Sequence, residues 1–266
     1  MPDFPCATPV NADLGIGSGS LDITAEERES ASVDVVPHNP NDTHAREAAD
    51  ATEVTFDGDT LIVRTPEAGI GWLFKRLPAL RITVRLPLGS NVRAKSASAD
   101  VTLRGRAGKV TIITASGGVH VAEADEVSAN SGSGDVKVID ALGRVHANTA
   151  SGDIEIDRAE GEITTRSASG DVRIGEAGGS VSATTASGDV LIRQGASGVY
   201  KIRTVSGEVS VGVAKGTGVW LDLSSTSGRT SSDLAVGDTP VAVATPDLNL
   251  QVRTVSGDIE VVRTQA

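Results

Sequence analysis

The sequence predicts an all-β fold, a single-stranded parallel β-solenoid with ~18 residues and two strands per coil and an irregular β cap at its N-terminal end. The main observation is a Ser-Gly-Asp tripeptide, or a close relative, that recurs at a nearly fixed interval. Its copies start at Ser98, Ser116, Ser133, Ser151, Ser169, Ser187, Ser206, Ser227 and Ser256. The first six intervals are 17 to 19 residues, and the last two are 21 and 29. Aromatic residues are only 2% of the 266 residues, which suits a thin aliphatic core.

Each 18-residue unit divides into two halves of nine residues. Residues 169–177 read SGDVRIGEA, and residues 178–186 read GGSVSATTA. Both halves have a turn with glycine near its second place, then apolar residues at places four and six. Alternation with period two predicts a strand, and a glycine at a fixed turn position suggests a backbone angle that a side chain would resist. Each coil is therefore predicted to be two short strands joined by two tight turns.

The apolar places of the two halves predict two parallel sheets that face each other across a narrow core. The first strand of each coil supplies large aliphatic residues, and the second supplies smaller ones. The expected inward residues of the first set are Val136, Val138, Ile154, Ile156, Val172, Ile174, Val190 and Ile192. Those of the second set are Val145, Ala147, Thr149, Val181, Ala183 and Thr185.

Two other repeat architectures compete with this interpretation. Left-handed helices of triangular section also use 18 residues per coil, as three hexapeptides, but here the sub-period is nine. The nine-residue calcium-binding roll has a G-G-x-G-x-D pattern. In this chain the acid directly follows a single glycine, and alternate half-repeats carry Arg144, Glu162 or Ser180 instead. We therefore favour the two-strand coil and expect no metal and no cofactor.

Three regions follow along the chain. Residues 1–9 are expected to be a flexible tail, residues 10–90 a β cap packed on the solenoid, and residues 91–266 the repeats. The elements expected in the cap are strands at 21–23 and 32–36, a helical turn at 44–49, a hairpin at 53–64 and a strand at 80–86. The hairpin has Asp57-Gly58 as its turn signal.

The C-terminal end of the repeat region is less regular. Residues 231–247 contain Pro240 and Pro246 and predict a looped excursion. Residues 248–262 then return to the pattern, and we expect them to form the final coil. Trp220 is expected to pack on the last regular coils.

The net charge of −11 is unevenly distributed. Residues 1–74 hold 14 acids and three bases, whereas residues 75–109 hold one acid and nine bases. This basic belt consists of Lys75, Arg76, Arg81, Arg85, Arg93, Lys95, Arg104, Arg106 and Lys109. It either faces the acidic N-terminal strands of the same molecule or binds an anionic partner. Nucleic acid is excluded as a partner because the chain is acidic overall and the belt has almost no aromatic residues for stacking.

Residues 69–77 combine large apolar residues with two bases. They are interpreted either as a plug over an open end of the solenoid or as an exposed contact for a membrane surface or a protein. The candidate partner contacts are Trp72, Leu73, Phe74, Lys75, Arg76, Arg81 and Arg85.

A second candidate site is a column of acids at the repeat turns. Stacking places Asp135, Asp153, Asp171, Asp189 and Asp258 along one edge, ~4.8 Å apart. We expect each carboxylate to cap its turn by accepting backbone N–H bonds. Cation binding or ligand recognition along the column is the alternative.

Recognisable catalytic motifs are missing from the sequence. It has no phosphate-binding glycine loop, dinucleotide fingerprint, nucleophile elbow or zinc spacing. Its one cysteine, Cys6, excludes an intramolecular disulfide. The first thirty residues lack a basic segment followed by an apolar one, so we expect no signal peptide, no transmembrane segment and a cytoplasmic location, with peripheral membrane association left open.

The Ser-Gly-Asp-apolar-x-apolar turns at this period, with residues 82–90 (ITVRLPLGS) after the Asp57-Gly58 hairpin, resemble a known family. It is the bacterial β-strand-repeat family labelled "putative adhesin", also called toastrack. The resemblance implies a β-solenoid without an established activity, and related domains are attached to membrane proteins of envelope-stress systems. We expect a non-enzymatic binding or scaffold module. The alternatives are an envelope-stress regulatory module that docks on a membrane or membrane protein, and a polysaccharide-acting β-helix enzyme.

Overall fold

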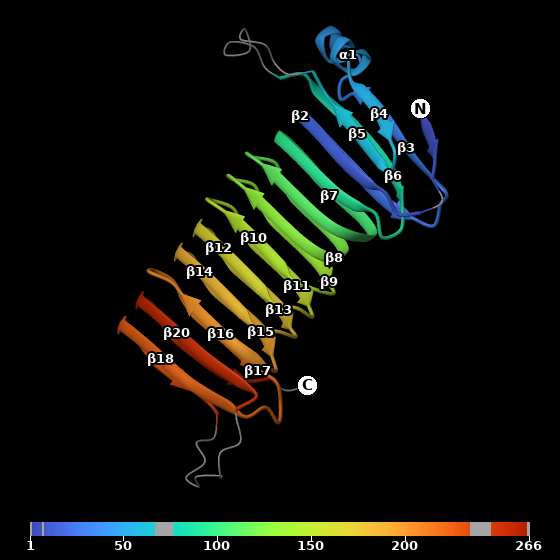
Figure 1. Ribbon diagram of the computed structural model, residues 1–266. Helices are drawn as coiled ribbons and strands as arrows, with labels where there is room; N and C mark the ends of the chain where they lie inside the picture. The colour runs from blue at the N-terminus through green and yellow to red at the C-terminus, as the bar shows by residue number, and fades with distance from the viewer. Residues whose placement is uncertain (1, 7, 67–76, 235–245, 265–266) are drawn as a thin grey trace. The chain divides into compact units, whose positions relative to one another are not determined.

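The computed structural model describes residues 2–6, 8–66, 77–234 and 246–264. The chain is an all-β parallel solenoid with two strands per coil, as the repeat predicted (Figure 1). It divides into two compact units, residues 1–137 and 138–266. The helix α1 (Thr43–Asp50) has eight residues, and within the described ranges no helix is long and apolar enough to cross a membrane.

The strands of the second unit follow one another as short, regular pairs. They are β10 (Val145–Thr149), β11 (Ile154–Ala159), β12 (Ile163–Ser169), β13 (Val172–Ala177), β14 (Val181–Ser187), β15 (Val190–Gly195), β16 (Gly198–Arg203), β17 (Val209–Val213), β18 (Val219–Ser227), β19 (Thr230–Ser232), β20 (Leu248–Ser256) and β21 (Ile259–Arg263). The strand β9 (Val136–Ala141) contains the boundary between the units.

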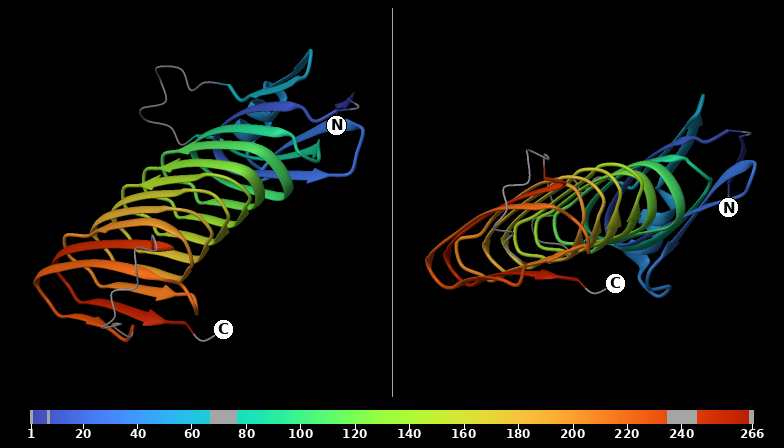
Figure 2. Two further views of the ribbon diagram at one scale, coloured as in Figure 1. Left: turned by 60° about the horizontal axis from the view of Figure 1, so that its bottom comes forward. Right: turned by 90° about the horizontal axis from the view of Figure 1, so that it is seen from below.

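Parallel pairing between coils builds two sheets in this unit. The even sheet has the order β10, β12, β14, β16, β20, β18, and the odd sheet has the order β11, β13, β15, β17, β21, β19. The register follows the repeat, so that Ile154 pairs with Val172, and Val172 pairs with Val190. The coils are seen nearly end-on in Figure 2.

The predicted core positions are confirmed. Every residue expected to point inward, in both the large and the small set, is buried. Ile154, Ile156 and Ile192 have no exposed surface, and the inward Thr185 is 2% exposed. Because large aliphatic side chains of one sheet face small ones of the other, the two strands of one coil can lie close together.

Two of the turn glycines, Gly170 and Gly188, are required for a different reason from the one expected. A Cβ on Gly170 would lie 2.1 Å from the carbonyl oxygen of Gly152, and one on Gly188 would lie 2.2 Å from that of Gly170. Neither glycine has a backbone angle that disfavours side chains. The close approach of stacked turns, and not the conformation of each turn, therefore selects glycine at these two positions.

The C-terminal segment does not form the last coil of the stack. The strand β20 pairs with β16 on one side and β18 on the other, and β21 lies in the same way between β17 and β19. The expectation of a final coil at 248–262 is therefore corrected: these residues are inserted one coil from the end (Figure 1). Trp220 was expected to be packed but is 47% exposed, because it occupies an outward position of β18.

The first unit has longer strands and a mixed sheet. They are β1 (Asp3–Pro5), β2 (Asn11–Glu26), β3 (Ser30–Pro37), β4 (Glu53–Asp57), β5 (Thr60–Arg64), β6 (Ala79–Pro87), β7 (Asn91–Thr114) and β8 (Val119–Ser131). The N-terminal strand β2 lies between β5 and β6 on one side and β7 on the other, all parallel. Two antiparallel strands continue beyond this sheet, with β3 on β6 and β4 on β5.

Local signals account for the elements of this unit. The hairpin β4–β5 turns at Gly58, which has φ +61°. Asp42 caps α1 by accepting the backbone N–H groups of His44 and Ala45 at 3.0 and 3.2 Å. Residues 1–9 were expected to be a flexible tail, but the structure places β1 there, antiparallel to β3, and the ring of Phe4 stacks on that of Phe56 with centroids 5.3 Å apart.

Candidate functional site

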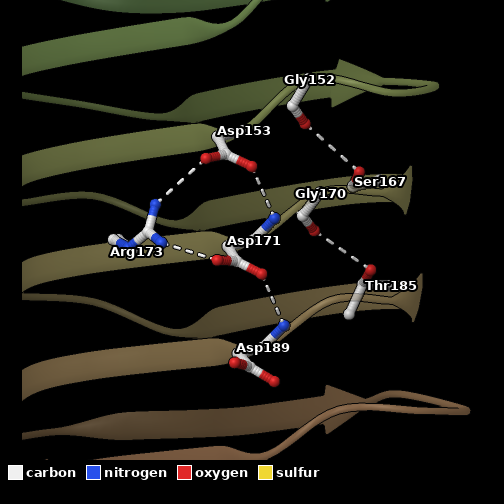
Figure 3. Close-up of polar contacts among 8 residues, drawn as sticks. All are labelled: Gly152, Asp153, Ser167, Gly170, Asp171, Arg173, Thr185 and Asp189. Atoms are coloured by element: carbon white, nitrogen blue, oxygen red, sulfur yellow. Dashed lines mark hydrogen bonds and ion pairs between the residues drawn. The ribbon is translucent and has the colours of Figure 1, made fainter.

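The aspartates at the repeat turns form an aspartate ladder, most regular at Asp153, Asp171 and Asp189. Each stands at the start of an odd-sheet strand. The Oδ1 atom of Asp153 accepts the backbone N–H of Asp171 at 2.9 Å, and Oδ1 of Asp171 accepts that of Asp189 at 2.9 Å. Asp189 accepts the N–H of Glu208 at 2.8 Å. Figure 3 shows the ladder from Asp153 to Asp189.

The donor of each bond lies in the following coil, whereas we expected the carboxylate to cap its own turn. The same arrangement occurs in the first unit, where Asp100 accepts the N–H of Gly118 at 2.9 Å. At the C-terminal end, Asp258 of the inserted coil accepts the N–H of Arg229 at 2.8 Å. Asp135 stands at the corresponding turn, and its backbone carbonyl accepts the N–H of Val119 at 2.8 Å. The aspartate ladder thus joins neighbouring coils.

Arg173 offsets the repulsion between two neighbouring carboxylates of the ladder. Its Nη1 lies 3.2 Å from Oδ2 of Asp153, and its Nη2 lies 2.6 Å from Oδ2 of Asp171 (Figure 3). The hydrogen bond with Asp153 is the main cause that raises the pKa of Arg173 above its ordinary value. Like charges one strand apart repel. The guanidinium of Arg173 lies between the two carboxylates, offsets this repulsion and donates a charge-assisted hydrogen bond to each.

A second ladder of buried hydroxyl groups runs beside the carboxylates, and the sequence analysis missed it. The hydroxyl of Thr185 donates to the carbonyl of Gly170 at 3.4 Å, and that of Ser167 donates to the carbonyl of Gly152 at 3.5 Å. Figure 3 shows both bonds beside the aspartate ladder, and Ser167 and Thr185 are both buried. The sequence signal for this ladder is a Ser or Thr three residues before the glycine of each Ser-Gly-Asp turn.

The surroundings of the aspartate ladder are a shallow polar depression. A cavity of about 220 Å³ is lined by Asp171, Arg173, Asp189 and Glu208, with Leu191 among its apolar neighbours. Across the described ranges, no group of three or more His, Cys, Asp or Glu side chains is arranged to hold a metal ion. The absence of a calcium requirement stays a prediction.

In the described part of the chain, four members of the basic belt pair with acids of neighbouring strands. Arg104 lies 3.3 Å from Asp22, and Arg85 lies 3.9 Å from Glu26, so both face acids of β2. Two further members, Arg106 and Lys109, pair with acids of β8. These pairs are exposed and each contributes at most about 1 kcal/mol.

The predicted partner contacts are only partly placed. Trp72, Leu73, Phe74, Lys75 and Arg76 lie outside the described residues. Arg81 and Arg85 are exposed on β6, where Ile82 and Val84 between them point into the core, as expected. Contact of this segment with a partner stays a prediction.

Another basic cluster was missed because it comes from strands that are far apart in the sequence. Lys201 and Arg203 of β16 are exposed on the outward face of the even sheet, and Arg253 of β20 pairs directly with Arg203. Arg166 of β12 stands on the same row, two strands away from Arg203. The pKa of His146 is lowered mainly by burial and to a smaller extent by the charge of Arg166.

Comparisons with known proteins agree with this architecture. A family model described as Toastrack DUF4097 matches residues 12–262. The crystal structure of a "putative adhesin" from Bacteroides fragilis is 13% identical and has a TM-score of 0.51, with 99% of this chain and 95% of that chain covered. The structure of a "putative lipid binding protein" from Parabacteroides distasonis is 15% identical with a TM-score of 0.47, covering 99% and 96%. A search of curated proteins finds no match. At such identities, the likeness to the first structure shows the fold alone.

Proposed function

The chain belongs to the Toastrack DUF4097 family, as its repeat turns predicted, and we propose that it is a non-enzymatic binding or scaffold module. Its partner is a protein or an anionic surface. The observation that carries this proposal is the regularity of the stack, in which equivalent side chains of successive coils stand in register at the spacing of β-strands. Such a surface repeats one chemical group many times and suits an extended partner.

The bonding of the acids supports binding over catalysis. A β-helix enzyme that acts on polysaccharides would need carboxylates available to substrate. In the aspartate ladder, Asp153, Asp171 and Asp189 each commit Oδ1 to a backbone N–H of the next coil. Arg173 also takes the second oxygen of Asp153 and of Asp171. These acids hold the coils together, which is a structural role.

The regular coils combine a buried core with continuous backbone ladders. Most inward side chains of the regular coils are at most 2% exposed, and in the odd sheet their ladder neighbours are similar aliphatic residues. A partner that binds such a surface meets a backbone that the ladders already order, so less backbone entropy is lost on binding.

The test is an affinity capture with the full chain immobilised, followed by mass spectrometry and by a binding titration with each purified candidate. Ile174→Asp, which places a charge in the core, is the control for adsorption that does not need the fold. We expect at least one partner that binds the parent and not this variant. Incubation with acidic and neutral polysaccharides should release no new reducing ends. Release of sugar products by the parent, and not by Ile174→Asp, would overturn the non-enzymatic proposal.

A further inference from the structure

The outward face of the even sheet changes its chemistry in the last three coils. At matching ladder positions, β14 carries Ser182 and Thr184 where β16 carries Lys201 and Arg203. The positions on either side change in the same way. The sequence Ser180, Ser182, Thr184, Ala186 of the outward row in β14 becomes Val199, Lys201, Arg203, Val205 in β16. We call the outward residues of β16, β20 and β18, together with Val205 just after β16, the C-terminal face.

Large apolar side chains are exposed on this face. Val199 is 39% exposed, Val205 53%, Val255 51% and Trp220 47%. They share a face with the bases because strand residues alternate: in β20, Arg253 and Val255 stand two residues apart with buried Thr254 between them. None of these side chains points into the core, whose inward positions in β16 and β20 hold buried residues.

The charges of the C-terminal face are predominantly positive. Arg203 and Arg253 are direct ladder partners, ~4.8 Å apart in the sheet, and like charges that close destabilise the fold. The one acid of the face, Asp222, lies 3.6 Å from Arg253. Within the described residues, Lys201 and Arg203 have no ion pair. A chain with a net charge of −11 thus concentrates uncompensated bases beside exposed apolar groups.

We propose that the C-terminal face binds the surface of a lipid bilayer that contains anionic phospholipid. This inference rests on the proposed binding function and names one partner for it. Lys and Arg beside a membrane attract anionic headgroups. Tryptophan and aliphatic side chains enter the boundary between headgroups and acyl chains. Val199 and Trp220 on one side of the bases, and Val205 and Val255 on the other, supply that apolar part.

The size of the face favours a membrane over a protein. Three strands ~4.8 Å apart, with seven residues of ~3.3 Å each, cover roughly 300 Å². A stable protein–protein interface needs about 800 Å² on each partner. Peripheral membrane binding does not require that area, because a few bases and apolar side chains act on a surface with many headgroups.

The experiment is vesicle co-sedimentation of the full chain. One set of vesicles contains phosphatidylcholine alone, and the other contains phosphatidylcholine with phosphatidylglycerol. The test variant is Lys201→Ser/Arg203→Thr, which gives β16 the residues that β14 has at the same positions. The control is Arg193→Gln/Arg229→Gln, which removes the same charge from exposed arginines that lie at the odd-sheet side.

We expect binding to the anionic vesicles only. The test variant should bind about 30-fold more weakly, the effect of two bases near an anionic surface, and the control should bind within about twofold of the parent because its changes lie off the face. In a Trp72→Phe background, fluorescence from Trp220 should shift to shorter wavelength with anionic vesicles. Circular dichroism and melting curves establish that both double variants are folded.

The outcomes separate this inference from the proposed function. Equal vesicle binding by the test variant and the parent overturns the assignment to the C-terminal face. If the parent does not bind anionic vesicles but binds a purified partner from the affinity capture, the membrane is the wrong partner and the proposed binding function still holds. If it binds neither, both proposals are wrong.

Discussion

The N-terminal and C-terminal ends of the chain are built in the same way but finished differently. In the first unit β2 is inserted between β5 and β6 on one side and β7 on the other, and in the second unit β20 and β21 are inserted before the outermost coil. Beyond β6 the chain adds antiparallel β3, whereas among the described residues no strand pairs with the outer edge of β18.

The inward side chains at the two ends are buried to different extents. In β6 the inward Leu80, Ile82 and Val84 are at most 2% exposed. In β18 the inward Leu221 and Leu223 are only half-buried. An inserted terminal strand pairs with a neighbour on both edges, but the coil outside it exposes its inward residues unless another element covers them. The N-terminal end has one in β3 and α1, and the C-terminal end is therefore expected to be the first part of the stack to open.

The largest loss of stability is expected from a truncation that removes the inserted strands. Removal of residues 248–266 deletes β20 and β21 and leaves the outermost coil without its neighbour. Five fully buried side chains are lost, each contributing about 1.5–3 kcal/mol: Leu248, Leu250, Val252, Ile259 and Val261. The longer truncation of residues 215–266 ends the stack cleanly at β17. We expect the shorter truncation to aggregate and melt at lower temperature than the longer one. Equal melting of the two would contradict the inserted topology.

A charge in the core tests the difference in burial directly. Ile174→Asp, at a position 1% exposed, should cost about 4 kcal/mol or more because the carboxylate has no partner in the core. Leu221→Asp in the half-buried outer coil should cost less than half of that. Denaturant unfolding of both variants is the measurement, with outward Ser182→Asp as the control. A cost for Leu221→Asp as large as that for Ile174→Asp would show that the outer coil is as well covered as the middle.

Tyr200 gives a pH-dependent probe close to the C-terminal end. It is fully buried, its hydroxyl donates to the carbonyl of Ala177 at 3.1 Å, and burial raises its pKa to about 12. The unfolded chain has a tyrosine pKa of ~10, so the native state favours the neutral form. This contribution is complete below pH 10 and is lost as the pH rises from 10 to about 12.

The loss amounts to roughly 3 kcal/mol for a shift of about two pKa units. Tyr200 is the only tyrosine, so the absorbance of tyrosinate reports this residue alone. We expect ionisation to coincide with loss of strand signal, and Tyr200→Phe to remove this part of the alkaline destabilisation. A titration near pH 10 in the folded protein would mean that the side chain is exposed to water.

The smallest expected effect concerns the aspartate ladder. Asp171→Ala removes an acceptor for the next coil and a partner of Arg173, and should cost about 1–2 kcal/mol. Asp100→Ala in the first unit removes a single such acceptor and should cost about 1 kcal/mol. Asp171→Asn keeps an oxygen at the same place and serves as the control in urea unfolding. Unfolding unchanged by Asp171→Ala would mean that the inter-coil bond contributes nothing.

The coil was predictable from the sequence because its signals are local. Alternating residues such as Val172 and Ile174 identify the inward face, and Asp57-Gly58 identifies a hairpin. The order of coils was not predictable, because the pattern around Leu250 and Val252 fits any position in the stack. Sequence order suggested that this segment comes last, and the pairing with both β16 and β18 shows otherwise.

The same limit applies to the candidate sites. A carboxylate at a turn can accept a backbone N–H from its own coil or from the next one. The 18-residue spacing is the same in both cases, so the sequence does not indicate which donor is used. Arg203 and Arg253 are fifty residues apart in the sequence yet adjacent in the even sheet. No short stretch of the sequence contains both arginines, so their cluster can be recognised only when the inserted topology is known.

The inserted C-terminal coil also sets an order of events during synthesis. The ribosome makes β18 before β20, so β18 emerges without its ladder partner. Until residues 248–263 appear, the growing chain has an open edge at β16 and a detached outer coil. An incomplete chain at this stage therefore exposes an unpaired strand edge and is prone to aggregate until β20 pairs with both β16 and β18. Nascent chains that stall in this window are expected to depend on chaperones more than chains that stall fifty residues earlier.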